Sequence, residues 1–131
     1  MHHVQQLING QFTQSTTDEW IDITDPATQE VIAKVPQSTD DEINQAVAAA
    51  QTAFQTWRKT PITTRARIFL KYQSLIREHM DELAEILTAE QGKTVADARG
   101  DVFRGLEVVE HAAGIANLQI GDFVENVASG V

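Results

Sequence analysis

Arg104 is the residue of this sequence with the strongest claim to a chemical role. It lies between two glycines, Gly100 and Gly105. A guanidinium group offers a rigid fork of donors that holds a carboxylate or a phosphate at two points. A glycine inside a helix costs about 1 kcal/mol relative to alanine and often marks a close approach of another backbone. Residue types also allow a surface ion pair with Asp101 or Glu107, each three positions away, so both interpretations stay open.

Three other groups of residues fit structural roles better than chemical ones. Gly92-Lys93-Thr94 matches the end of a phosphate-binding loop, but the motif needs a glycine where Leu87 stands and a strand where a helix is predicted. His79 and His111 each lack a second histidine at metal-ligand spacing. The acidic residues 40–42 fit the electrostatics of a helix start. We therefore predict no catalytic residue, no metal site and no cofactor-binding residue in this chain.

Composition bounds the chemistry further. The chain has no cysteine, so it has no thiolate nucleophile, disulfide or cysteine-ligated metal. Its 131 residues, 42% hydrophobic and 22% charged, are typical of one soluble globular domain. A net charge of −9 repels phosphate backbones and anionic lipid, which argues against nucleic-acid and membrane partners. Because no apolar run approaches about 18 residues and the first residues do not match a signal peptide, we expect a cytoplasmic protein.

Arg104 lies on a predicted helix. The helix is predicted to begin at Thr94, because Thr94 and Asp97 can cap its first turn reciprocally, and Gly92 can close the helix before it. Arg104 then falls on the side opposite an apolar face. That face, which we expect to be core, recurs at steps of three and four residues: Val95, Ala98, Val102, Leu106, Val109 and Ala113.

Three more helices are predicted before this one. A capping signature at Ser38 and Thr39 and an apolar stripe predict a helix over about residues 40–59, which Thr60 and Pro61 end. Apolar residues at helical spacing predict a second helix around residues 68–76 and a short third one that runs to Gly92. After residue 118 the helical period is lost.

The first 36 residues are predicted to form strands. An Asn-Gly pair at residues 9 and 10 stands between two short apolar runs, which indicates a tight hairpin turn. Residues 20–24 and 31–35 are strands, joined by a turn at residues 25–28. We expect one small antiparallel sheet over residues 6–36. The fold class is α+β: N-terminal antiparallel hairpins (1–36), then four amphipathic helices (37–131), in one incomplete folding unit.

The order of several short motifs resembles the N-terminus of aldehyde dehydrogenases. They are LING at residues 7–10, DPATQEV at 25–31, AFQTW at 53–57, RARI at 65–68 and EQGKT at 90–94. Three more resemble the CoA-acylating methylmalonate-semialdehyde dehydrogenases: WRKTP at 57–61, GDVFRGLEVVEHA at 100–112 and ENVAS at 125–129. The sequence departs from this pattern after Ile115, where a proline is expected and Ala116 stands.

The resemblance implies a function and a role for Arg104. Such enzymes oxidise malonate or methylmalonate semialdehyde with NAD, lose CO₂ and transfer the acyl group to coenzyme A. Arg104 matches the arginine that binds the substrate carboxylate in these enzymes, which favours the functional interpretation of this residue. The resemblance also implies a homo-oligomer and an N-terminal portion of an α/β NAD-binding domain.

The resemblance also implies what this chain lacks. In the family the nucleophilic cysteine, the general-base glutamate and the NAD-binding units come later in a chain several times longer. We therefore expect an N-terminal fragment that is catalytically inactive on its own. An alternative of another class is a stand-alone helical interaction module derived from a truncated dehydrogenase.

Overall fold

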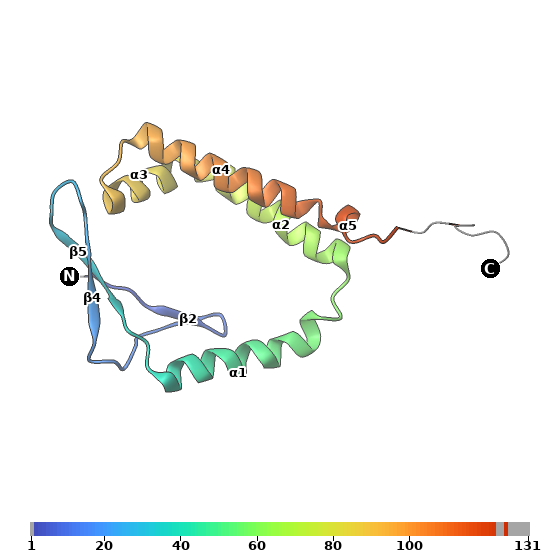
Figure 1. Cartoon of the computed structure of the whole chain (residues 1–131), viewed down its shortest axis with the longest axis horizontal. Coiled ribbons are helices and arrows are strands. Elements are labelled where there is room, and N and C mark those ends of the chain that lie inside the picture. The colour runs from blue at the N-terminus through green and yellow to red at the C-terminus, as the bar shows by residue number, and fades with distance from the viewer. Residues whose placement is uncertain (1, 123–124, 126–131) are drawn as a thin grey trace.

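The computed structural model describes residues 2–122 and residue 125, and its elements form an open ring (Figure 1). Helix α1 lies along one side of the ring, α2 to α4 lie along the opposite side, and strands close one end. The strands are β1 (His2–His3), β2 (Gln6–Ile8), β3 (Gln11–Thr13), β4 (Trp20–Thr24) and β5 (Val31–Pro36). The helices are α1 (Asp40–Trp57), α2 (Ile62–Glu78), α3 (Met80–Gln91), α4 (Val95–Ala113) and α5 (Ile115–Leu118).

The strands form two sheets. The hairpin of β2 and β3 turns at Asn9 and Gly10, which both have positive φ, as the Asn-Gly pair predicts. The second sheet has the order β1-β5-β4, with β4 antiparallel and β1 parallel to β5. The prediction of one antiparallel sheet over residues 6–36 was therefore wrong. The segment that leaves β3 is hydrogen-bonded to α1 through Ser15 and Thr16, so the hairpin is held apart from β4 and β5.

Local capping signals place the starts of α1 and α4 near the predicted positions, whereas α2, predicted around residues 68–76, begins earlier, at Ile62, without a side-chain cap. Thr39 and Glu42 form a reciprocal capping box at α1. At α4 the Thr94 hydroxyl accepts a hydrogen bond from the Asp97 N–H, but the reciprocal bond predicted there is not made. The side chain of Asp97 is one methylene shorter than that of a glutamate, which explains why it does not reach back. Gly114 ends α4 and separates α5 from it, so five helices are described where four were predicted.

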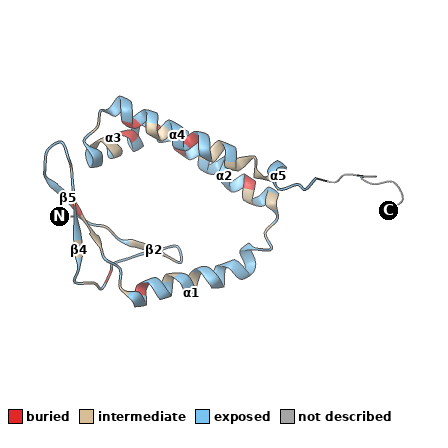
Figure 2. Ribbon diagram, in the orientation of Figure 1, coloured by how far each residue is buried: buried red, intermediate tan, exposed pale blue. Residues whose placement is uncertain are grey.

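The buried core is small and lies where α2, α3 and α4 meet (Figure 2). Ile76, Met80 and Leu106 form it, and the half-buried Val102 and Val109 pack against it. The predicted buried face of α4 is confirmed at Ala98 and Leu106. Its first residue, Val95, is 47% exposed and lies at the start of the helix.

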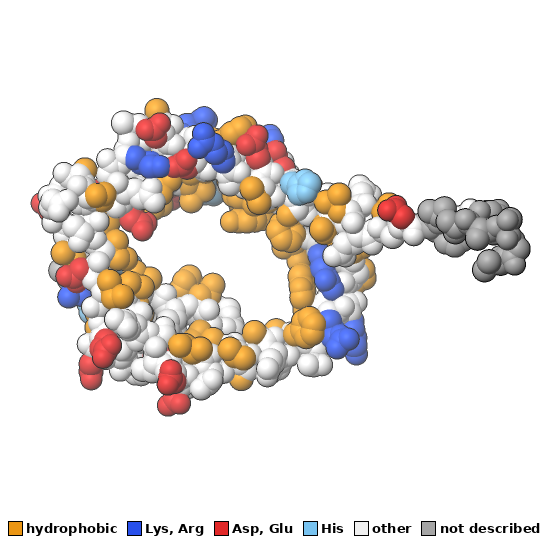
Figure 3. Space-filling model, viewed as in Figure 1, with side chains coloured by type: hydrophobic (Ala, Val, Ile, Leu, Met, Phe, Trp, Pro, Cys, Tyr) orange, Lys and Arg blue, Asp and Glu red, His pale blue; other side chains and the backbone are white. Residues whose placement is uncertain are grey.

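Most of the predicted apolar helix faces are exposed and turn toward the opening of the ring. Hydrophobic side chains line this opening in Figure 3. The apolar stripe of α1 is exposed at Ile43, Val47, Phe54 and Trp57, and that of α2 at Ile68 and Tyr72. An apolar pocket of about 540 Å³ lies between the three-stranded sheet and α3. The helical periodicity was confirmed, but these faces are not core in this chain.

Among the described residues, no helix combines the length and the apolar character that crossing a membrane requires.

Candidate functional site

Arg104 lies on the outward side of α4, away from the core that Leu106 helps to form. Its side chain is 79% exposed. Of the two acidic neighbours considered from the sequence, Asp101 makes the contact: Arg104 Nη1 lies 3.4 Å from Asp101 Oδ1. This distance is long for a charge-assisted hydrogen bond, which closes to about 2.7–2.9 Å. Most of the guanidinium donors therefore face solvent.

Asp101 has a second and closer partner. Lys93, in the connection between α3 and α4, donates through Nζ to Asp101 Oδ2. The hydrogen bond and the charge of Lys93 lower the pKa of the Asp101 carboxyl, with a smaller contribution from Arg104. Lys93, Asp101 and Arg104 thus form a row of alternating charges on one side of α4. We call these three residues the Arg104 cluster.

The glycines beside Arg104 leave open space. A Cβ atom placed on Gly100 or Gly105 would meet nothing within 4 Å. The close backbone approach considered from the sequence is therefore not made by the described part of this chain. The two glycines instead leave open space beside Arg104. Its neighbour Val108, one helical turn further on, is an apolar side chain that is 69% exposed.

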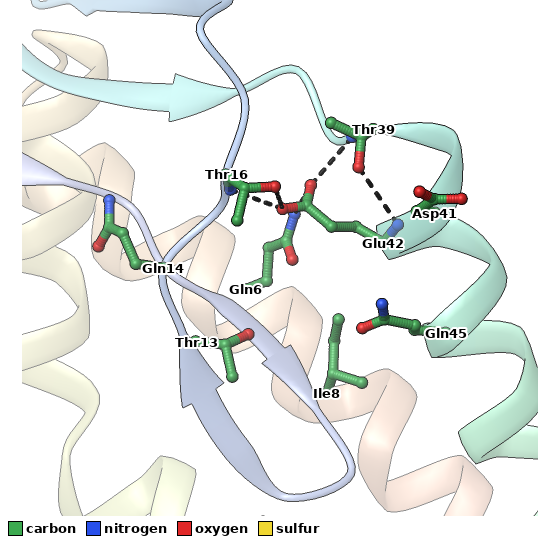
Figure 4. A pocket seen from close by; sticks show the side chains of 9 residues that line it. All are labelled: Gln6, Ile8, Thr13, Gln14, Thr16, Thr39, Asp41, Glu42 and Gln45. Atoms are coloured by element: carbon green, nitrogen blue, oxygen red, sulfur yellow. Dashed lines mark hydrogen bonds between the residues drawn. The ribbon is translucent and has the colours of Figure 1, made fainter.

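A second polar group lies at the start of α1, around the carboxylate of Glu42, for which the sequence pattern predicts only a role at the helix start. Glu42 faces an open pocket of about 420 Å³ between the hairpin and α1 (Figure 4). Its carboxylate accepts hydrogen bonds from the Thr16 N–H at 2.7 Å and from the Thr39 N–H at 2.9 Å. The side chains of Ser15, Thr16 and Gln6 donate at 2.9–3.1 Å.

These donors fix the chemistry of Glu42. Its pKa is lowered to about 2, and the backbone hydrogen bonds from Thr16 and Thr39 are the largest causes. A carboxylate that is ionised and fully hydrogen-bonded in this way does not take up a proton near neutral pH, so it is not a general base. The spacing of Thr39 and Glu42 predicts the cap, but Ser15 and Thr16 lie 27 and 26 residues away, where no local pattern finds them.

The other candidates from the sequence have structural roles. Gly92 closes α3 in a left-handed conformation with φ of 69°, and Thr94 is the N-cap of α4. His79 pairs with Glu82 at 2.8 Å, and His111 is exposed in the last turn of α4. Of the ENVAS motif at residues 125–129, only Glu125 is among the described residues, and residues 126–129 lie outside them.

Comparison with known proteins identifies the family. The model of the aldehyde dehydrogenase family matches residues 12–130. The acylating mitochondrial methylmalonate-semialdehyde dehydrogenase of Arabidopsis thaliana is 56% identical over 98% of this chain and 21% of its own length. The methylmalonate-semialdehyde/malonate-semialdehyde dehydrogenase of Rattus norvegicus, also acylating and mitochondrial, is 50% identical over 95% of this chain and 23% of its own length.

Solved structures agree with the sequence match. A structure described as methylmalonate-semialdehyde dehydrogenase from Sinorhizobium meliloti 1021, complexed with NAD, has a TM-score of 0.90 and 39% identity, over 99% of this chain and 26% of that chain. The enzyme from Oceanimonas doudoroffii has a TM-score of 0.89 and 36% identity, over 99% and 26%. The described chain therefore spans about a quarter of these proteins and has the fold of their N-terminal part. The predicted family and fold class are confirmed: this chain belongs to the aldehyde dehydrogenase family.

Proposed function

We propose that this chain is the N-terminal part of an NAD-dependent, CoA-acylating methylmalonate- or malonate-semialdehyde dehydrogenase. The observation that carries the proposal is the 56% identity to such an enzyme over nearly the whole chain. In the proposed reaction the aldehyde is oxidised, NAD is reduced to NADH, CO₂ leaves and coenzyme A takes the acyl group. We expect NAD and coenzyme A to bind the intact enzyme, and we expect that enzyme to be a homo-oligomer. A cytoplasmic location stays a prediction. The Arabidopsis and rat relatives are named mitochondrial.

Within this function we propose that Arg104 binds the carboxylate of the semialdehyde. The exposed guanidinium and its loose contact with Asp101 support this role, because its donors are available to a ligand. A small semialdehyde offers few groups for recognition besides its carboxylate. A two-point contact there would fix both the affinity and the direction in which the aldehyde points.

Replacing Arg104 in the intact enzyme tests this role. We expect Arg104→Leu to raise KM for malonate semialdehyde by roughly 10- to 100-fold, the value of a charge-assisted hydrogen bond, and to leave KM for NAD unchanged. Arg99→Leu is a matched control, because Arg99 lies on the same helix but pairs with Asp81 of α3. Steady-state kinetics with both substrates measures the effect. An unchanged KM for the semialdehyde in Arg104→Leu would remove Arg104 from the site.

The isolated chain is expected to be catalytically inactive. Without a cysteine, no thiohemiacetal or thioester can form on it. The measurement is NADH formation by the purified 131-residue chain with semialdehyde, NAD and coenzyme A. Turnover above that of a sample without protein would contradict the prediction.

The second candidate function is a stand-alone helical interaction module. The exposed apolar faces of α1 and α2 favour it, since such surfaces mark association sites. Under this alternative the purified chain forms a defined oligomer or binds intact dehydrogenase subunits. A coding sequence that continues in frame and encodes a cysteine would instead support the dehydrogenase.

A further inference from the structure

Lys93 is held in place from both sides along the backbone. Gly92 before it is left-handed and packs against the turn between β4 and β5: a Cβ atom on Gly92 would lie 2.7 Å from Ala27 Cβ and 2.8 Å from Asp25 Oδ1. Thr94 after it caps α4. The backbone at Lys93 therefore has little freedom, and its side chain, 29% exposed, reaches along α4 to Asp101.

The contact between Asp101 and Arg104 is loose by the standard of this molecule. The other two ion pairs described between arginine and carboxylate side chains close to 2.6 Å, for Arg77 with Glu110, and to 2.8 Å, for Arg99 with Asp81. Arg104 and Asp101 stay at 3.4 Å, although they are one helical turn apart. Those two closer pairs each join two helices, and Asp101 also differs from Glu110 and Asp81 in having a second cation, Lys93, on its other oxygen.

Two effects of Lys93 on Arg104 follow, and both favour binding of an anion. First, Lys93 draws Asp101 to itself, so Asp101 touches the guanidinium at one nitrogen and orients it without covering the other donors. Second, the cluster keeps a formal charge of +1, from two cations and one carboxylate. Without Lys93, Asp101 would be free to pair fully with Arg104, and the pair would be neutral toward a carboxylate ligand.

We propose that Lys93 is a positioning residue for Arg104, which it keeps available to the substrate carboxylate by holding Asp101. This rests on the proposed role of Arg104. The EQGKT motif does not form a phosphate-binding loop, and this proposal gives its lysine a different role. Lys93 acts through Asp101 and is not placed in contact with the substrate.

The test uses the full-length dehydrogenase and two aldehydes of equal carbon number. Malonate semialdehyde has the carboxylate, and propionaldehyde lacks it. The quantity measured is the preference for malonate semialdehyde, as the ratio of kcat/KM for the two. We expect Lys93→Met to lower this preference by roughly three- to tenfold, mainly through KM for the semialdehyde. Lys93→Arg restores it to within about twofold, because the charge returns.

Combining variants separates this inference from the proposed function. In an Arg104→Leu background, Lys93→Met should have no further effect on the preference, because the two residues act as one unit. An equal loss in both backgrounds, or a loss of kcat/KM of the same size for both aldehydes, would overturn the inference. If Arg104→Leu lowers the preference and Lys93→Met does not, the inference fails alone. If neither does, the role of Arg104 fails as well.

Thermal unfolding checks folding, and Lys93→Gln replaces Lys93→Met if the latter does not fold.

Discussion

At the scale of single residues, one carboxylate joins three parts of the chain. Glu42 of α1 accepts hydrogen bonds from β2 through Gln6, from the segment after β3 through Ser15 and Thr16, and from its own helix start through Thr39. Removing the carboxylate would take away the acceptor that the Thr16 and Thr39 N–H groups share, and a buried donor left unpaired costs more than the net value of a hydrogen bond. Glu42 therefore attaches the hairpin to α1.

Acid should weaken this attachment. The pKa of Glu42 is about 2 in the folded chain and 4.5 in a model compound, so its stabilisation is fully present above pH 4.5 and is lost as the pH falls toward 2. We expect Glu42→Gln to increase amide hydrogen exchange at Thr16 near pH 7, and the difference from the unchanged chain to shrink at about pH 3. Asp41→Asn is the matched control, because it removes the same charge from the same helical turn but at an exposed residue. Equal effects of the two variants would contradict the prediction.

At the scale of elements, the end of α3 meets the turn between β4 and β5. Gly92 lies against Asp25 and Ala27, and the Asp25 carboxylate itself accepts a hydrogen bond from the Ala27 N–H at 2.8 Å. This contact closes the ring at the end opposite the connection between α1 and α2 (Figure 1). It is made by a glycine, because any Cβ atom there would overlap the turn.

Two glycines of the same conformation allow this contact to be measured. Gly92→Ala should lower the free energy of unfolding by roughly 1–2 kcal/mol, because alanine disfavours the left-handed conformation. Displacement of the turn by the added Cβ atom should lower it further. Gly10→Ala is the matched control: Gly10 has φ of 76°, but a Cβ atom on it meets nothing within 4 Å, so only the conformational cost remains. Amide exchange at Ala27, whose N–H is bonded within the turn, should rise in Gly92→Ala and not in Gly10→Ala. Unchanged exchange at Ala27 in Gly92→Ala would argue against the contact.

At the scale of the whole molecule, the described part of the ring leaves more large hydrophobic side chains exposed than it buries. Its small core lies within one arm, among Ile76, Met80 and Leu106, whereas α1 has no buried apolar residue. Figure 3 shows hydrophobic side chains around the opening. Under the proposed function, other parts of the dehydrogenase cover these faces. The division into a hairpin segment, 1–36, and a helical portion, 37–131, stays a proposal, and the hydrogen bonds of Glu42 cross this boundary.

The isolated chain should therefore behave as a protein with unsatisfied apolar surface. We expect the purified chain to bind an apolar fluorescent dye and to associate or lose fixed side-chain packing, since such surfaces drive both. Dye fluorescence and sedimentation velocity measure this, with the full-length enzyme as the control that binds less dye per mass. A monodisperse monomer with as little dye binding as the full-length enzyme would contradict the expectation.

The sequence by itself determined the local structure and the family. The turn at Asn9 and Gly10, the end of α3 at Gly92 and the caps at Thr39 and Thr94 depend on interactions within about four residues, which a sequence displays directly. The order of the short motifs likewise predicted the aldehyde dehydrogenase family, which the family match confirms.

Only the tertiary structure decided which groups meet and which faces are covered. The donors on Glu42 come from positions up to 36 residues away, and the contact of Lys93 with Asp101 spans the connection between a left-handed glycine and a helix cap. Helical spacing predicts that a face is apolar but not what lies against it. The stripe of α1, with Ile43 half exposed, is therefore a true helix face without a core in this chain. Covering such a face depends on contacts between distant segments, and local sequence patterns do not encode those contacts.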